Sequence, residues 1–343
     1  MLINEWAIVF NLLSIALMGL LAAAALLAFI WPLIARHITL FSAATQKTLL
    51  WLFVVTPWVA SILCLFIFLP SVFQLESTLW LTPLAHWHHP YVFYLDSWHG
   101  AALFLFMLGT AYVFIRSGLG AARHLNALNL LTRLSKENPG SRIQNNSRQW
   151  KIGRDMIGQN MIGQDVIVLE SRTPVAFVVG LLNPRCYVTT GLIEQVSEAE
   201  LEIILAHERA HIKHKDTRKK LFFALLASLY PKPITQRLNR LFSLATEQLA
   251  DAHVSQSYSV FDIAQTLVNA AKIQRFSGVN VKAVSINYFI TDDVDVRVRA
   301  LVAPQEFRSF PWAYCLLIMM LTTTLSFAGV DTLHHLIEAI FSH

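Results

Sequence analysis

The residues best suited to chemistry are His207, Glu208 and His211, which stand in an H-E-x-x-H pattern. On a helix, side chains four positions apart lie on one face. Two imidazoles at this spacing can bind one Zn²⁺, which is the cofactor that the pattern predicts. Glu208 is rotated by about 100° from His207, beside the ion, where a general base takes a proton from water. Ser197 and Glu200 form a capping box that marks the start of this helix.

A catalytic zinc site requires a third protein ligand and one open position. Glu247 follows His211 at a distance that allows one helix to end and another to return. It is therefore the predicted third ligand. Asp251, one turn further on, is predicted to accept the N–H of a ligand histidine and so fix its tautomer. His214 and His253 are weaker candidates for the third ligand and are interpreted as surface residues, and Asp216 is interpreted as a turn or capping residue.

The composition indicates a membrane protein. Hydrophobic residues make up 55% of the 343 residues and charged residues 14%, against about 45–50% and about 25% in soluble domains. This excludes a disordered chain. A transmembrane helix needs about 20 mostly apolar residues. Four stretches meet this condition, and the prediction is four transmembrane helices at Trp6–Ala35, Thr48–Phe73, Trp98–Ile115 and Phe310–Val330.

The placement of basic residues predicts the orientation. Lys and Arg are absent from residues 1–35, 74–115 and 309–343, and basic residues near spans stay in the cytoplasm. Both termini are therefore expected outside. Residues 1–115 form three spans with short loops, 116–308 a cytoplasmic domain, and 309–343 the fourth span with a short outer tail. The basic domain is expected near anionic lipid. Without a nucleic-acid motif, no direct nucleic-acid contact is expected.

The cytoplasmic segment is predicted to be an α+β domain. Short strands are expected at residues 165–170, 175–179 and 186–189, before the motif helix. Further helices are expected at 221–230, 234–253 and 262–276. The mixed residues 277–296 carry no clear pattern.

The sequence also resembles a known family. The run TPVAFVVGLLNPRCYVTTGLIEQVSEAELEIILAHERAHIKHKD, followed by EQLAD, is similar to the antirepressor metallopeptidases of BlaR/MecR type, which are membrane gluzincins. The resemblance is strongest over residues 173–251 and extends to the topology of 1–330. E-x-x-A-D after H-E-x-x-H also resembles the HtpX and CAAX prenyl protease group. The resemblance implies a zinc peptidase domain of gluzincin type between spans three and four, in the bacterial inner (cytoplasmic) membrane.

The resemblance also implies roles for individual residues. His207, His211 and Glu247 would be zinc ligands and Glu208 the general base. The family further implies that Arg297 is a catalytic cation and that Asp251 accepts a hydrogen bond from a ligand histidine. It also implies that the strand around Ala176-Phe177-Val178 is a sheet edge to which a substrate adds by β-augmentation. Arg299 remains an alternative to Arg297, and both arginines are equally compatible with anchoring the fourth span.

The predicted function is an integral-membrane zinc metalloendopeptidase that cleaves a cytoplasmic protein in signal transduction. The expected substrate is a DNA-binding transcriptional repressor, with self-cleavage as a further outcome. One alternative is an HtpX-like quality-control protease, and another is a non-catalytic receptor stabilised by zinc. About a dozen residues follow the fourth span, so the C-terminal penicillin-binding sensor domain of the family is expected to be missing. An outer histidine cluster is open to metal or pH sensing or to an interfacial role, and comprises His86, His88, His89 and His99.

Overall fold

The computed structural model describes residues 2–3, 5–72, 92–93, 100–101, 103–112, 114–115, 118–119, 166–277, 287–288, 293–303 and 308–341. The chain divides into two compact units. The first comprises Met1–Gly118, Leu226–Leu238 and Arg308–His343, and the second comprises Leu119–Leu225 and Asn239–Phe307. The domain boundaries expected near residues 115 and 308 stay a prediction.

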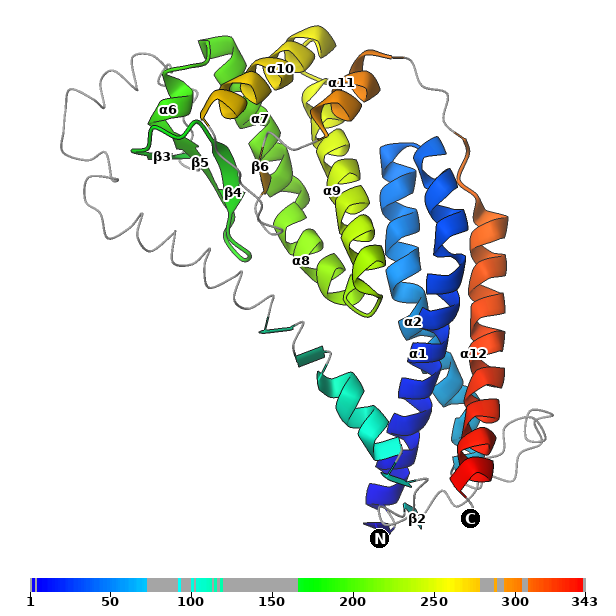
Figure 1. Ribbon diagram of the computed structural model, residues 1–343. Helices are drawn as coiled ribbons and strands as arrows, with labels where there is room; N and C mark the ends of the chain where they lie inside the picture. The colour runs from blue at the N-terminus through cyan, green and yellow to red at the C-terminus, as the bar shows by residue number, and fades with distance from the viewer. Residues whose placement is uncertain are drawn as a thin grey trace. The chain divides into compact units, whose positions relative to one another are not determined.

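Long apolar helices form the first unit. Helix α1 (Glu5–His37) continues into a 3-10 turn, η1 (Ile38–Leu40), and α2 (Ala43–Val72) follows. With α12 (Trp312–Phe341), they pack side by side (Figure 1). Two short strands, β1 (Leu2–Ile3) and β2 (Val92–Phe93), pair antiparallel.

In the part of the chain that the structure describes, three helices are long and apolar enough to cross a membrane, namely Glu5–Leu40, Ala43–Leu69 and Trp312–Val330. They correspond to the first, second and fourth predicted spans. The third predicted span is only partly described. There the structure shows an apolar helix at Leu103–Tyr112 that is shorter than a span. The structure thus supports a membrane protein, while the third predicted span, and with it the total of four, stays a prediction. Helix α12 continues to Phe341, through residues expected in an outer tail.

Small residues bring α1 and α2 close together. A Cβ atom at Gly19 would lie 3.2 Å from the Sγ atom of Cys64. The Ser61 hydroxyl donates a hydrogen bond to the carbonyl oxygen of Ala16, at 2.7 Å. Without a hydrophobic driving force between helices in lipid, such close packing and interhelical hydrogen bonding are what hold spans together.

The second unit carries a four-stranded sheet. Its strands are β3 (Val166–Leu169), β4 (Ala176–Val179), β5 (Arg185–Thr189) and β6 (Asn287–Tyr288), in the order β3-β5-β4-β6. Strand β3 is parallel to β5, whereas β4 is antiparallel to both β5 and β6. The strands expected at 165–170, 175–179 and 186–189 are thereby confirmed to within a residue.

The prediction that Ala176-Phe177-Val178 forms a sheet edge is wrong. Strand β6 pairs with β4, with Phe177 opposite Tyr288 and Val178 opposite Asn287. On its other edge, β4 pairs with β5. Because β4 is hydrogen-bonded on both sides, it is an internal strand, and a substrate cannot extend the sheet there while β6 stays in place.

The helices of the second unit are α6 (Thr190–Ile193), α7 (Glu198–His214), α8 (Asp216–Ala227), α9 (Lys232–Val254), α10 (Val260–Ser277) and α11 (Val294–Val302). Helices α8 and α9 extend into the first unit at their joined ends.

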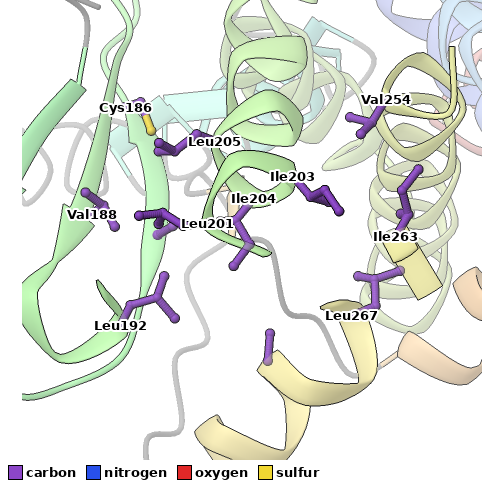
Figure 2. Close-up of a cluster of buried hydrophobic side chains, with 12 residues drawn as sticks. Cys186, Val188, Leu192, Leu201, Ile203, Ile204, Leu205, Val254, Ile263 and Leu267 are labelled. Atoms are coloured by element: carbon purple, nitrogen blue, oxygen red, sulfur yellow. The ribbon is translucent and has the colours of Figure 1, made fainter. Parts of the chain in front are cut away.

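Apolar side chains on two sides of α7 build the core of this unit (Figure 2). Leu201 and Leu205 point toward β5, whereas Ile203 points toward Val254 and Ile263. These side chains are nearly inaccessible to solvent. The core therefore fixes the rotation of α7 about its axis, and with it the direction in which the H-E-x-x-H residues point.

Candidate metal centre

Helix α7 begins at a complete capping box. The Ser197 hydroxyl accepts a hydrogen bond from the Glu200 backbone N–H, and the Glu200 carboxylate accepts one from the Ser197 N–H at 2.9 Å. The helix ends at His214, and the left-handed backbone of the next residue, Lys215 (φ 56°), separates α7 from α8. The capping box thus sets the start of the motif helix, and the backbone turn at Lys215 ends it.

The two motif histidines meet in the interior. The Nε2 atoms of His207 and His211 lie 3.1 Å apart, and both side chains are about 1% exposed. Glu247 reaches them from α9, with its Oε2 atom 3.2 Å from the His207 Nε2 and 3.5 Å from the His211 Nε2. Within the described residues, these three form the group of ligand atoms that could hold a metal ion. The structure therefore brings the three predicted ligands together.

A carboxylate lies next to the Nδ1 atom of each imidazole, on the side of the ring opposite the Nε2 atom. The His207 Nδ1 lies 3.0 Å from the Asp251 Oδ1, and the His211 Nδ1 lies 3.0 Å from the Asp216 Oδ2. Metal-binding histidines usually donate their other ring N–H to such a group, which fixes the tautomer. Both Nε2 atoms are thus left to face Glu247. Asp251 lies where the sequence predicted it, whereas Asp216 is a buried partner of His211 and not a simple turn residue.

Burial and charge act in opposite directions on these groups. Burial opposes protonation of His207, but hydrogen bonds to Asp251 and Glu247 outweigh it and raise its pKa. Burial likewise opposes ionisation of Asp251, yet the Arg297 guanidinium and His207 lower its pKa to about 2. The cluster is therefore held together by its own ion pairs, which compensate for the loss of water around each group.

Arg297 on α11 is fully buried beside Asp251. Its Nε and Nη2 atoms donate to the two carboxylate oxygens of Asp251 at 2.8 and 2.6 Å, and its Nη1 lies 3.5 Å from the Glu247 Oε2. Arg299, two residues on, is exposed. The structure thus distinguishes the two arginines, because only Arg297 contacts the centre. The catalytic role predicted for Arg297 requires that this side chain contacts the substrate. That contact stays a prediction.

Glu208 lies beside the triplet and is fully buried. Within the described residues, neither of its carboxylate oxygens has a hydrogen-bond partner. Burial, followed by the nearby Glu247 charge, raises its pKa to about 8, against the favourable charges of His211, Lys220 and Arg297. A buried carboxylate without a partner needs an explanation. A metal ion and a water molecule beside it provide one, so the residues present fit a metal centre.

Lys220 is a member of the cluster that the sequence did not reveal. Its Nζ donates to the Glu247 Oε1 at 3.1 Å, and its side chain is 6% exposed. In the sequence it belongs to the basic run HKDTRKK, which is typical of a solvent-exposed helix face. Its spacing of one helical turn from Asp216, which places the two residues on the same helix face, could have indicated that Lys220 lies near the centre.

The weaker candidates lie elsewhere. The rings of His214 and His253 contact each other edge to face, with centroids 5.3 Å apart, outside the triplet. The predicted outer histidine cluster falls outside the described residues.

The raised pKa of Glu208 predicts that the metal-free protein loses stability as pH rises. Its pKa is about 8 in the folded protein against an ordinary 4.5, so the folded state binds the proton more tightly. The contribution of this proton to the free energy of unfolding is fully present below pH 4.5. It declines above that pH and is lost once the pH has passed 8. Glu208→Gln should therefore reduce the loss of unfolding free energy between pH 5 and 9 by an amount on the order of a few kcal/mol, and the melting temperature should fall less steeply over this range.

The measurement is thermal unfolding in detergent after chelation, with both proteins compared across this pH range. His207 and His211, whose pKa values are also raised, act in the same direction and remain in the variant. The slope should therefore shrink without vanishing. Equal slopes for wild type and variant would contradict the prediction.

Comparison with known proteins adds an independent result. Residues 143–294 match the sequence model described as Peptidase family M48. The protease HtpX homolog 2 of Methanosarcina mazei is 36% identical over 66 residues, which are 19% of this chain and 22% of that protein. An HtpX homolog of Acidiphilium cryptum is 43% identical over 65 residues, or 18% of this chain and 22% of that protein. Protease HtpX of Legionella pneumophila is 38% identical over 64 residues, or 18% and 23%.

The matched segments thus span less than a quarter of the length of each of these relatives. The family match covers the sheet, the motif helix and the helix that carries Glu247. The comparisons support a membrane gluzincin, but they do not extend to the antirepressor family of BlaR/MecR type. Together with the buried His-His-Glu group, they support a metallopeptidase enzyme with similarity to peptidase family M48 over residues 143–294.

Proposed function

We propose that this protein is a membrane-embedded zinc metalloendopeptidase. The observation that carries the proposal is the buried triplet of His207, His211 and Glu247 beside the carboxylate of Glu208, which has no hydrogen-bond partner among the residues that the structure describes. Two imidazoles and one carboxylate are the ligand set of catalytic zinc sites with an open position. A zinc ion that only stabilises the fold would need no carboxylate at the position of Glu208.

The residues of the centre divide the work of peptide hydrolysis. A bound zinc ion would supply Lewis acidity, polarising water and the peptide carbonyl. Glu208 accepts the proton of the attacking water on a carboxylate oxygen and passes it to the leaving amine. Asp251 and Asp216 hold the imidazoles through their Nδ1 atoms. Arg297 keeps Asp251 ionised and in place.

The proposed substrate is a protein at the cytoplasmic face of a bacterial inner membrane. The distribution of basic residues supports four spans with both termini outside and the peptidase domain inside. Lys and Arg are absent from residues 1–35, 74–115 and 309–343. Similarity to proteins named protease HtpX favours an HtpX-like protease that cuts several membrane or cytoplasmic proteins. Cleavage of a single DNA-binding repressor is the second candidate, supported by the resemblance of residues 173–251 to antirepressor peptidases.

A comparison of cellular proteomes separates the two substrate classes. Cells that contain the Glu208→Gln variant should accumulate uncut forms of the natural substrates. Many stabilised proteins would support the HtpX-like function. One stabilised regulator, together with altered transcription of its target genes, would support the antirepressor function.

Metal binding itself gives a direct test of the centre. Purified protein should contain about one zinc ion per chain, and His207→Ala should lose it together with all peptide hydrolysis, because one of three ligands is removed. Metal content is measured by mass spectrometry of the element in detergent-purified protein. His214→Ala is the matched control, since His214 lies on the same helix but outside the triplet. Equal metal content in His207→Ala and wild type would overturn the proposed function.

A further inference from the structure

The two carboxylate oxygens of Glu247 have different surroundings. The Oε2 atom faces the imidazoles, at 3.2 Å from the His207 Nε2 and 3.5 Å from the His211 Nε2. The Oε1 atom accepts a hydrogen bond from the Lys220 ammonium at 3.1 Å. One oxygen is therefore directed at the metal position, while the other is occupied by a cation on a different helix.

The contact between Lys220 of α8 and Glu247 of α9 lies beside a second contact between the same two helices. Three residues beyond Lys220 on α8, the ring of Phe223 stacks on Phe242 of α9, with centroids 4.1 Å apart and planes 8° from parallel. Both rings are fully buried. This apolar pair fixes the spacing of α8 and α9 beside the ion pair. The Lys220 ammonium has little freedom to leave the Oε1 atom, since its side chain is 6% exposed.

A carboxylate can bind a metal ion through one oxygen or through both. A catalytic zinc site keeps a coordination position open for water and substrate. If the Oε1 atom of Glu247 also bound the ion beside the water, the ion would already be five-coordinate, and no position would be left for the substrate carbonyl. A buried ammonium competes strongly with the ion for this oxygen, because charge-assisted hydrogen bonds are strong where water is excluded.

We propose that Lys220 is a positioning residue that restricts Glu247 to binding the metal through Oε2 alone, and so preserves the open coordination position. This role rests on the proposed function, because it requires a metal ion at the triplet. It assigns Lys220 an effect on coordination number beyond neutralising the charge of Glu247. It also explains why a lysine, whose burial is costly unless it is paired, lies in this interior.

The test uses Co²⁺ in place of the native ion in the full chain in detergent. Four-coordinate Co²⁺ absorbs visible light more strongly than five-coordinate Co²⁺, so the spectrum reports coordination number. Wild type should show the strong four-coordinate bands. Lys220→Met should bind Co²⁺ with weakened, five-coordinate bands, and its peptidase activity should fall by about 10–100-fold. Lys220→Arg should keep the strong bands, because it keeps a charged donor.

Lys219→Met, which removes an exposed neighbouring charge on α8, is the matched control and should resemble wild type. Unchanged bands in cobalt-loaded Lys220→Met would overturn the role of Lys220. Should that variant fail to fold, five-coordinate bands in wild type would overturn it equally, because Glu247 would then bind through both oxygens despite Lys220. Wild type that takes up no Co²⁺ at all would instead overturn the metal centre itself.

Discussion

Replacing Glu208 by glutamine should lower the kcat for peptide hydrolysis by roughly 10²–10⁴-fold, the range that general acid–base catalysis contributes. The amide cannot accept the proton of the attacking water. It occupies nearly the same volume, so the fold should persist. Because Glu208 is not one of the three ligand residues, the metal content should stay at the wild-type level. The measurement pairs steady-state kinetics on a protein substrate with elemental analysis of the same preparation.

Glu198→Gln is the matched control, since Glu198 is an exposed carboxylate on the same helix. It should leave kcat unchanged. If Glu208→Gln kept every cellular effect while His207→Ala lost them, the protein would be a receptor with a structural metal. That result would exclude the catalytic interpretation of the centre.

Replacing Arg297 by alanine should destabilise the protein by about 3–5 kcal/mol, which is the typical effect of removing one partner of a buried ion pair. Arg297 is 0% exposed and donates to both oxygens of Asp251. Without it, Asp251 and Glu247 remain buried with less positive charge nearby. The midpoint of thermal or denaturant unfolding should fall accordingly, measured on detergent-purified protein after chelation.

Arg299→Ala provides the comparison on the same short helix, because Arg299 is exposed. Its effect on stability should stay within about 0.5 kcal/mol. The double variant Arg297→Ala with Asp251→Asn should lose less stability than the two single variants together, since the second change removes the unpaired charge that the first one creates. Additive effects would show that the two side chains do not stabilise each other.

The sequence alone determined the features that depend on local spacing. The capping box at Ser197 marked the start of the motif helix, and the helical period placed His207 and His211 on one face. Glu247 and Asp251 were also found, because Glu247 follows His211 at a distance that allows a second helix to return, and Asp251 lies one turn further on the same face. The apolar stretches at α1, α2 and α12 were visible for the same reason, since membrane insertion depends on composition over about 20 consecutive residues.

The tertiary structure decided which groups meet across different elements. It showed that Asp216 and Lys220 belong to the centre, that Arg297 and not Arg299 joins them, and that β6 covers β4. No local pattern carries this information, because periodicity identifies the face of a helix or strand but not what packs against it. Strand β6 is two residues long, too short for an alternating pattern, and only its pairing with a strand more than a hundred residues earlier defines it.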